Sequence, residues 1–311
     1  MATKRRRRKK SPVVILFTLI LVIISGIYAA CEGIIDIPGI TDETTEAKSQ
    51  IENSAPVPED GEVLFHFIDV GQGDAILITS AEGNMLVDTS VQSARDELVA
   101  YLEAAGVHTI DYLVLTHPDA DHIGNADYII ENYDVKNILL PDFAATTKTY
   151  ERMLTAMENS EANVICPEPG YTFSIGALQN TVIAPNDDYK DANEVSIVIK
   201  SVYGETSVML TGDAEVESEE DIVKVWSAES LKCDILKVGH HGSTSSTTDD
   251  FLAAVDPEIA VISCGEGNTY GHPHVETIDK LNAKGVEIYR TDLLGNIVFK
   301  TDGESFTLVS D

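Results

Sequence analysis

The stretch that decides the architecture of this chain is His117-Pro118-Asp119-Ala120-Asp121-His122, which places four potential metal ligands within six residues. It directly follows an apolar run, residues 112–116 (YLVLT), that is typical of a short buried strand. Such a strand delivers polar side chains to a loop at a sheet edge, where they are rigidly supported and accessible. On a turn, these imidazoles and carboxylates can converge on one or two cations. The alternative is a solvated polar loop that caps a helix, which explains one His-x-Asp pair better than the whole cluster.

Segments with strand and helix character extend on both sides of this cluster, and no internal repeat is visible. The expected strands are 63–70, 75–79, 84–88, 112–116, 137–140, 181–184, 195–202, 206–211, 233–238, 259–263, 286–289 and 296–300. The expected helices are 93–105, 124–132, 216–227, 248–255 and 274–283. This alternation predicts an α/β fold with two sheets and helices packed outside them.

The first 31 residues have a different character from the rest of the chain. A basic run, KRRRRKK, precedes an uncharged apolar stretch that is long enough to span a bilayer. Because positive flanking charge marks the cytoplasmic side, we expect residues 1–11 to be a cytoplasmic tail and 12–31 a transmembrane anchor. Tyr28-Ala29-Ala30-Cys31 also resembles a bacterial lipoprotein processing site, which would instead anchor the chain through Cys31. Both interpretations predict a single-pass or lipid tether to the cell membrane, with the C-terminal domain outside.

Residues 32–60 are acidic, carry several Thr and Pro, and lack a sustained period, which predicts a flexible linker before a domain at 61–311. Beyond the N-terminal basic run, 14 basic residues stand against 52 acidic ones, a net charge of −38. Such a surface repels phosphate polymers at long range and argues against broad electrostatic capture of nucleic acid. The four cysteines show no CxxC spacing, which argues against a thiolate metal site.

Two stretches before the cluster also carry carboxylates at the ends of apolar runs. Residues 67–74 (FIDVGQGD) form a strand, a turn with two glycines and the start of a second strand. Residues 86–89 (LVDT) form another strand that ends in an acidic residue. Asp69 and Asp88 are therefore candidates to orient a metal-bound histidine from the second coordination shell. Each alone is also consistent with an ordinary turn aspartate.

Three stretches after the cluster complete the set of polar loops. VMLTGD ends in Asp213, whose carboxylate can bridge two cations. ILKVGHHGS ends a strand with His240 and His241, which point in different directions, so one is expected to bind metal and the other to contact substrate or transfer a proton. NTYGHPH adds His272 in a loop shaped by Gly and Pro. The two histidines outside these loops, His66 and another at position 108, are interpreted as structural or surface residues.

Taken in order, IDVGQGD, VDT, THPDADH, TGD, GHHGS and NTYGHP resemble motifs of the metallo-β-lactamase superfamily. They are most similar to the extracytoplasmic hydrolase domain of the ComEC-type competence proteins and their stand-alone relatives. The resemblance runs from about residue 62 to the C-terminus and implies a four-layer αββα sandwich with its metal site at strand-end loops between two sheets. The expected fold is therefore this sandwich preceded by one transmembrane helix.

The resemblance also implies roles for individual residues. His117 and Asp119 match ligands of one cation, Asp121 and His122 match ligands of the other, and Asp213 matches the bridging carboxylate. His240 or His241 matches a late ligand, and we assign His240 to the metal. The expected catalytic residues are Asp121, Asp213 and His241. The expected substrate-binding residues are His241, Ser243, Asn268 and His272.

The chain departs from the common superfamily pattern at two points. Many members have His where Asp119 stands, and a further His ahead of the bridging carboxylate. Residues 123–212 contain no histidine, and Asn193 and Ser196 occupy that region instead. The first cation site is therefore rich in oxygen ligands and poor in imidazole, so one or two divalent ions are expected, with Mn²⁺ as suitable as Zn²⁺.

The expected activity is hydrolysis by a metal-activated water, oriented by Asp121 or Asp213, with the second imidazole of the histidine pair stabilising oxyanion charge. The resemblance implies a phosphodiesterase or DNase, although the acidic surface argues against strong DNA binding. Wall polymers or choline phosphate esters are further phosphodiesters that suit the location. No stable protein partner is expected. The alternatives are a lactonase or β-lactamase acting on carbonyl substrates, and a non-catalytic metal-binding sensing module.

Overall fold

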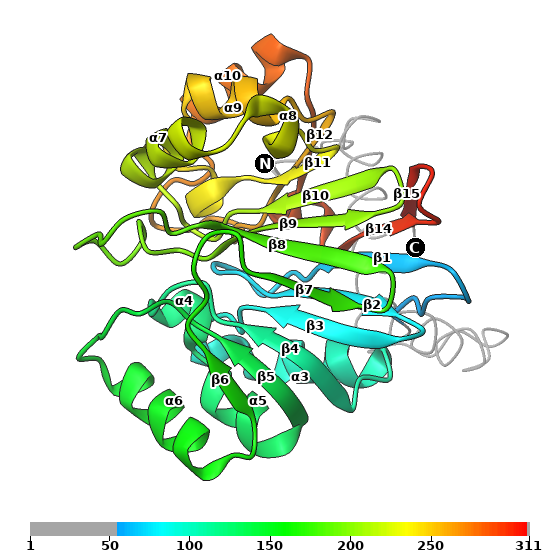
Figure 1. Ribbon diagram of the computed structural model, residues 1–311, viewed down its shortest axis with the longest axis vertical. Helices are drawn as coiled ribbons and strands as arrows, with labels where there is room; N and C mark the ends of the chain where they lie inside the picture. The colour runs from blue at the N-terminus through cyan, green and yellow to red at the C-terminus, as the bar shows by residue number, and fades with distance from the viewer. Residues whose placement is uncertain (1–54, 310–311) are drawn as a thin grey trace, which may run out of the picture. The chain divides into compact units, whose positions relative to one another are not determined.

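Two β-sheets face each other in the computed structural model, and helices cover the outer surface of each sheet (Figure 1). The structure describes residues 55–309. The predicted tail 1–11, the predicted anchor 12–31 and most of the predicted linker 32–60 lie outside these residues. No helix within 55–309 is long and apolar enough to cross a membrane. The predicted two-sheet α/β sandwich with four αββα layers is confirmed.

The first sheet has eight strands and combines an antiparallel half with a parallel half. Strands β15, β14, β1, β2 and β3 run antiparallel to their neighbours, whereas β3 to β6 run parallel. In spatial order the strands are β15 (Phe306–Val309), β14 (Ile297–Thr301), β1 (Val63–Phe67), β2 (Ile76–Ser80), β3 (Gly83–Val87), β4 (Thr109–Val114), β5 (Asp134–Leu139) and β6 (Asn163–Ile165).

The second sheet has seven strands and the same division. Strands β7 to β10 are antiparallel, whereas β10 to β13 are parallel. In spatial order the strands are β13 (Glu287–Arg290), β12 (Ile259–Ile262), β11 (Ile235–Lys237), β10 (Thr206–Leu210), β9 (Val198–Tyr203), β8 (Leu178–Ala184) and β7 (Thr172–Ile175).

The helices fall into two groups, one on each sheet (Figure 1). Those on the first sheet are η1 (Gln92–Ala94), α3 (Arg95–Ala104), α4 (Ala120–Ile123), α5 (Ala126–Asn132) and α6 (Lys148–Asn159). Those following strands of the second sheet are α7 (Val216–Val225), α8 (Ala228–Leu231), η2 (Gly239–Gly242), α9 (Asp249–Val255) and α10 (Val275–Lys284). A last short helix, α11 (Thr291–Leu294), connects β13 to β14.

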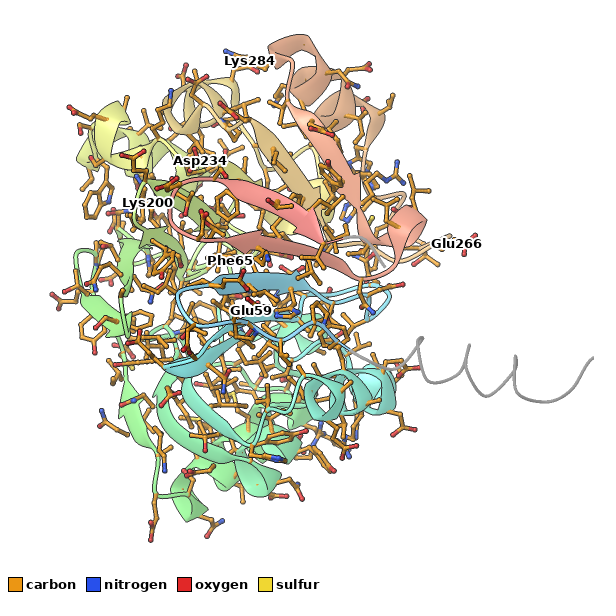
Figure 2. The ribbon with its side chains drawn as sticks, turned by 90° about the vertical axis from the view of Figure 1, so that its right-hand side faces the viewer. Glu59, Phe65, Lys200, Asp234, Glu266 and Lys284 are labelled. Atoms are coloured by element: carbon orange, nitrogen blue, oxygen red, sulfur yellow. The ribbon has the colours of Figure 1, made fainter. Side chains whose placement is uncertain are left out.

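Each layer boundary is filled by apolar side chains, and β1 shows how the sequence produces this. Every residue of β1 is buried, because successive side chains point to opposite faces and both faces are covered. Phe65 and Phe67 enter the core between the sheets. Figure 2 shows Phe65 in the middle of the molecule and the exposed Lys284 at its edge. His66 lies on the opposite face, where its Nδ1 is 2.9 Å from the Tyr101 hydroxyl. The structural interpretation of His66 therefore fits.

Some predicted boundaries differ from those of the structure. The strand expected at 63–70 ends at Phe67, before a turn in which Gly71 and Gly73 adopt positive φ. The helix expected at 124–132 begins at Ala126, because Asn125 lies outside the helical path and donates its side-chain amide to the carbonyls of Thr89 and Val91. A separate short helix, α4, occupies Ala120–Ile123, where a loop was expected. Helix α6 and strands β6, β7 and β15 were not predicted.

Helix α6 illustrates why these elements escape a pattern search. Its buried face consists of Met153, Ala156 and Met157, which recur at helical spacing but include no branched aliphatic residue. Strand β6 has only three residues and lies at the edge of its sheet, which leaves little periodic signal.

Candidate metal centre

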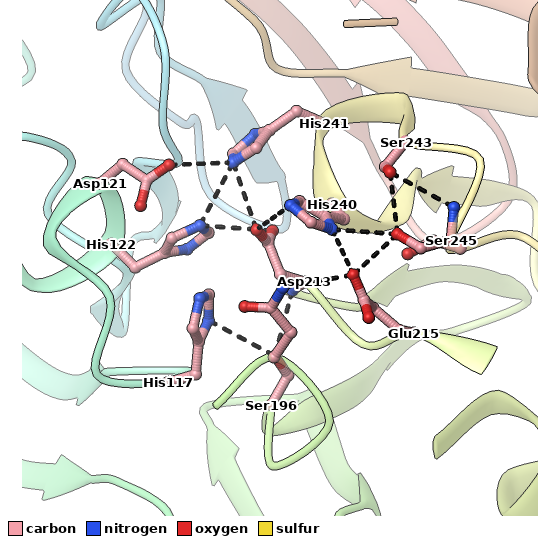
Figure 3. Close-up of polar contacts among 12 residues, drawn as sticks. His117, Asp121, His122, Ser196, Asp213, Glu215, His240, His241, Ser243 and Ser245 are labelled. Atoms are coloured by element: carbon pink, nitrogen blue, oxygen red, sulfur yellow. Dashed lines mark hydrogen bonds and ion pairs between the residues drawn. The ribbon is translucent and has the colours of Figure 1, made fainter. Parts of the chain in front are cut away.

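The parallel strands of both sheets end at one side of the sandwich, and the predicted site residues follow those ends. Asp88 follows β3, His117 follows β4, Asp213 follows β10 and His241 follows β11. Strands β3 and β4 are parallel neighbours in one sheet, and β10 and β11 are parallel neighbours in the other. Parallel neighbours present their carboxyl ends at the same edge of a sheet. The loops at these edges of the two sheets meet, so that His122 and His241, 119 residues apart, come into contact (Figure 3).

The six-residue cluster divides into buried histidines and more accessible carboxylates. His117 and His122 are 1% and 0% exposed, which does not fit a solvated polar loop. Asp119 is exposed and precedes α4, but its side chain makes no capping hydrogen bond. Asp121 lies in the first turn of α4 and is partly buried. The cluster therefore directs its imidazoles into the molecule.

His122 is held in one orientation by a buried carboxylate. Its Nδ1 lies 2.7 Å from Oδ2 of Asp88, and Asp88 also accepts hydrogen bonds of 2.8 and 2.7 Å from the backbone N and hydroxyl of Thr116. This leaves Nε2 of His122 facing the centre, 3.3 Å from Asp213 Oδ1 and 3.3 Å from His241 Nε2. The predicted supporting position of Asp88 matches this geometry.

His241 has the same arrangement on the opposite side of the centre. Its Nδ1 lies 2.9 Å from the carbonyl oxygen of Ser263, which accepts the ring proton. Its Nε2 lies 3.4 Å from Asp213 Oδ2 and 3.6 Å from Asp121 Oδ2. With one ring nitrogen held by a carbonyl, the other is free to bind a cation.

His117 completes the inner wall. Its Nδ1 lies 3.1 Å from the Thr116 hydroxyl and 3.4 Å from the hydroxyl of Ser196. Its buried Nε2 has no hydrogen-bond partner in the described part of the chain, and Oδ1 of Asp213 has only the contact of 3.3 Å with Nε2 of His122. Burying a polar atom without a hydrogen-bond partner costs free energy of folding. The position of such an atom beside a carboxylate therefore indicates a site that binds a cation.

The donor set fits a divalent cation. Imidazole nitrogens and carboxylate oxygens converge from both sheets, which is the ligand chemistry of Zn²⁺ and Mn²⁺ sites. Within each of four groups, the potential ligand atoms lie within 4.8 Å of one another. The groups are His117, His122 and Asp213; Asp121, His122 and His241; Asp74, Asp213 and His241; and Asp74, Asp88 and His122.

The charges of the centre are strongly coupled. Burial lowers the pKa of His122, but the carboxylates of Asp213 and Asp88 outweigh it and raise that pKa well above its ordinary value. Burial likewise opposes protonation of His241, but Asp213 and other carboxylates raise its pKa to about 9. Burial lowers the pKa of His117 to about 3. Because a cation uses the same nitrogen lone pairs as these protons, metal binding here tightens as the pH rises.

The fold and this constellation agree with comparisons to known proteins. A sequence profile of the metallo-β-lactamase superfamily matches residues 68–266. The chain belongs to the metallo-β-lactamase superfamily. Its fold is that of a metal-dependent hydrolase, and the His and Asp groups supply candidate sites for divalent ions.

The resemblance of this metallo-β-lactamase domain to competence proteins is confirmed. ComE operon protein 3 of Bacillus subtilis (strain 168) is 33% identical over 260 residues, which cover 78% of this chain and 33% of that protein. Competence protein ComA of Neisseria gonorrhoeae is 32% identical over 247 residues, with the same two coverages of 78% and 33%. The chain spans about a third of the length of these relatives.

A solved structure gives a fold-level likeness. The metallo-β-lactamase fold protein YhfI of Bacillus subtilis aligns with a TM-score of 0.53 at 13% identity, covering 77% of this chain and 100% of that one. At this identity the match supports the fold and nothing finer.

Within the metallo-β-lactamase domain, the two adjacent histidines have different surroundings. His240 Nδ1 lies 2.7 Å from Oε1 of Glu215, while its Nε2 lies 3.7 Å from Asp213 Oδ2. Its side chain is 24% exposed, against 1% for His241. His241 belongs to two of the four ligand groups, whereas His240 and Asp119 belong to none. The geometry thus favours His241 as the ligand and His240 as a partly exposed group whose Nε2 lies near Asp213 without joining a ligand group, the reverse of the sequence-based assignment.

The other predicted residues lie at varying distances from the centre. His272 stacks near the pair, with ring centroids 5.3 Å from His240 and 6.3 Å from His241. Asn268 shapes the His272 loop by donating to the carbonyl oxygens of Gly265 and His272. The Ser243 hydroxyl contacts that of Ser245, on the outer side of His240 (Figure 3).

Asp69 has no contact with the metal-facing histidines. Its carboxylate accepts the backbone N–H of Gly71, and its own N–H donates to the side chain of Asn296. These contacts are those of a turn aspartate, the alternative considered above.

Three residues near the centre had no predicted role. Asp74 and Lys237 form an ion pair behind His241, and Glu215 orients His240. Asp74 lies in the glycine turn and Lys237 within an apolar strand, so only the meeting of two sheets reveals their partnership. A lysine in the run ILKVG was the available signal, since a charged residue inside a buried strand requires a partner.

Proposed function

We propose that this chain is a membrane-tethered, extracytoplasmic, metal-dependent phosphodiesterase, with nuclease activity as its first candidate reaction. One observation carries the hydrolytic assignment: the free Nε2 atoms of His122 and His241 converge on the carboxylate of Asp213. Similarity to competence proteins supports the phosphodiester substrate. The basic run followed by an apolar stretch supports the tether, through either a transmembrane anchor at 12–31 or a lipid on Cys31.

A bound divalent cation supplies a Lewis acid that acidifies water and polarises a phosphoryl oxygen. Asp121, His122, Asp213 and His241 would hold one such ion, and His117 with Asp213 would contribute to a second. Zn²⁺ and Mn²⁺ both suit this mixture of nitrogen and oxygen donors.

His240 is the residue best placed to act on the substrate. Glu215 and the hydroxyl of Ser245 hold its Nδ1 side, at 2.7 and 3.3 Å. Its Nε2 is then directed toward the centre beside Asp213, on the accessible side of the site. In this proposal, the Nε2–H donates to a phosphoryl oxygen or to the departing oxygen of the ester.

The deciding experiment measures bound metal and three hydrolytic activities of the full-length chain. Metal content is measured by mass spectrometry, and activity on bis-p-nitrophenyl phosphate, single-stranded DNA and a lactone. Asp213→Asn and Asp121→Ala should lower phosphodiester hydrolysis at least about a hundredfold, because both carboxylates face the centre. Asp250→Asn, an exposed change in α9, is the matched control and should retain full activity.

Other outcomes would redirect the assignment. Activity confined to the lactone would indicate a carbonyl hydrolase, and bound metal without turnover on any substrate would favour a sensing module. Full phosphodiester activity in Asp213→Asn would place the reaction elsewhere.

The location has its own test. Cys166 is exposed, whereas Cys233 and Cys264 are buried. On intact cells, a membrane-impermeant maleimide should label the otherwise wild-type protein through Cys166, and Cys166→Ser should remove most of that labelling. Labelling that requires lysis would contradict an extracytoplasmic domain.

A further inference from the structure

A buried ion pair lies directly behind the candidate metal centre. Lys237 Nζ is 2.7 Å from Asp74 Oδ2, and the two side chains are 0% and 1% exposed. The ammonium also donates to the carbonyl oxygen of Val238, at 3.0 Å. Burying two charges is costly, and an apolar pair of similar size often stabilises a fold equally well. The pair therefore requires an explanation beyond folding stability.

Asp74 contacts two of the candidate ligands. Its backbone N–H donates to the carbonyl oxygen of Asp121 at 3.2 Å. Its Oδ1 lies 3.5 Å from Nδ1 of His241 and has no hydrogen-bond partner in the described part of the chain. A side chain at the preceding residue, Gly73, would collide with the Asp121 carbonyl, so this turn packs tightly against the ligand helix.

Lys237 belongs to the strand that leads into the His240-His241 loop. The ion pair thus connects the glycine turn of the first sheet to the strand of the second sheet that carries His241. Asp74 uses a different oxygen for each neighbour: Oδ1 lies near Nδ1 of His241, and Oδ2 pairs with Nζ of Lys237.

We propose that the Asp74–Lys237 pair positions the metal ligand His241, with Asp74 stabilising the ring orientation that presents Nε2 to the cation. Lys237 keeps the carboxylate charged and directed toward itself, so that Asp74 supports a ligand and does not become one. The Ser263 carbonyl accepts the Nδ1 proton of His241 at 2.9 Å, and the negative charge of Asp74, 3.5 Å from the same nitrogen, adds to this support and strengthens the ligand. This inference rests on the metal centre of the proposed function.

The test compares the full-length wild type with the Asp74→Val/Lys237→Met double variant, which replaces both charges with apolar groups of similar size. Mn²⁺ and Zn²⁺ dissociation constants are measured by competition with a chelating dye. The visible spectrum of the Co²⁺-loaded protein reports ligand geometry, and calorimetry of the metal-free protein reports stability. We expect a near-native Tm, metal binding about 10- to 100-fold weaker and a changed Co²⁺ spectrum.

Wild-type affinity and an unchanged Co²⁺ spectrum in the double variant would overturn the proposal and leave the pair a purely structural role. If the double variant does not fold, Asp74→Asn provides the second measurement, and undiminished metal affinity there would also overturn it. Glu62→Gln/Lys300→Met, which removes an ion pair at the opposite end of the strands of the first sheet, is the matched control and should leave metal affinity unchanged. Failure of the wild type to bind any divalent ion would instead overturn the proposed function itself.

Discussion

Three imidazoles around Asp213 share one design: a partner holds Nδ1 and thereby determines where Nε2 points. The partner is Asp88 for His122, the Ser263 carbonyl for His241 and Glu215 for His240. The two fully buried rings face each other and form the candidate metal centre, whereas the partly exposed His240 faces the accessible side. Residue type alone would assign the same role to all three imidazoles. Their roles differ because their Nδ1 partners and their degrees of burial differ.

Asp88→Asn should weaken metal binding about 10- to 100-fold. Asp88 accepts three hydrogen bonds, two from Thr116 and one from His122, and an amide places a donor where one of these acceptors was. The measurement is chelator competition with Mn²⁺ and Zn²⁺. Unchanged affinity would contradict a supporting role for Asp88.

Glu215→Gln should lower kcat on bis-p-nitrophenyl phosphate by about tenfold or more while leaving metal content unchanged. The reason is that Glu215 holds His240, which lies outside the ligand groups. Steady-state kinetics and metal analysis of the same preparation separate the two effects. Loss of metal together with kcat would instead make His240 a ligand, as the sequence-based assignment had it.

At the scale of elements, two buried glutamates attach the site loops to the helices of the second sheet. Glu194 accepts the backbone N–H groups of residues 215, 217 and 218, at the start of α7. Glu219 accepts those of Thr247 and Thr248, at the start of α9. Each carboxylate satisfies backbone donors that a helix N-terminus leaves unpaired. The loops after Asp213 and His241 are thereby fixed to the scaffold.

Glu219 makes stability depend on pH. Burial raises its pKa to about 7, above an ordinary value of 4.5. A raised carboxyl pKa contributes stability below pH 4.5 that is lost as the pH rises through 7. As the pH rises from about 5 to about 8, the free energy of unfolding of the wild type should therefore fall by about 2 kcal/mol relative to that of Glu219→Gln.

Urea unfolding of both metal-free proteins at the two pH values provides the measurement. A stability difference that does not change with pH would show that Glu219 stays ionised in the fold.

The strands and helices differ in how well the sequence predicts them. Strand β4 and helices α9 and α10 were predicted because apolar residues with a clear period end at a cap or a polar loop. Helix α6 also has a clear amphipathic period, but Met and Ala form its buried face, so a search for branched aliphatic residues passes over it.

At the scale of the whole molecule, the acidic surface bears on any nucleic-acid substrate. The net charge of −38 beyond the basic run opposes the approach of a polyanion, and added salt screens that repulsion. A site that hydrolyses DNA in this protein must therefore recognise the phosphodiester locally.

The KM for single-stranded DNA should accordingly fall, by about twofold or more, as salt rises from about 50 to about 200 mM, the reverse of ordinary DNA-binding proteins. The KM for bis-p-nitrophenyl phosphate, which carries a single charge, should change much less. A KM for DNA that rises with salt would reveal a basic surface that captures the polymer.

The superfamily, the two-sheet fold and most of the residues that meet at the centre can be predicted from local sequence patterns. This is possible because catalytic loops follow buried strands, and both leave local patterns in the chain. The strand-end positions of His117, His122, Asp213 and His241 are readable in this way.

Three facts could be obtained only from the folded molecule: which adjacent histidine joins the ligand groups, that Asp69 lies apart from the centre, and that Lys237 pairs with Asp74. These facts depend on contacts between residues far apart in the chain. Side-chain direction at a strand end is set by the opposing sheet, and no local pattern encodes it.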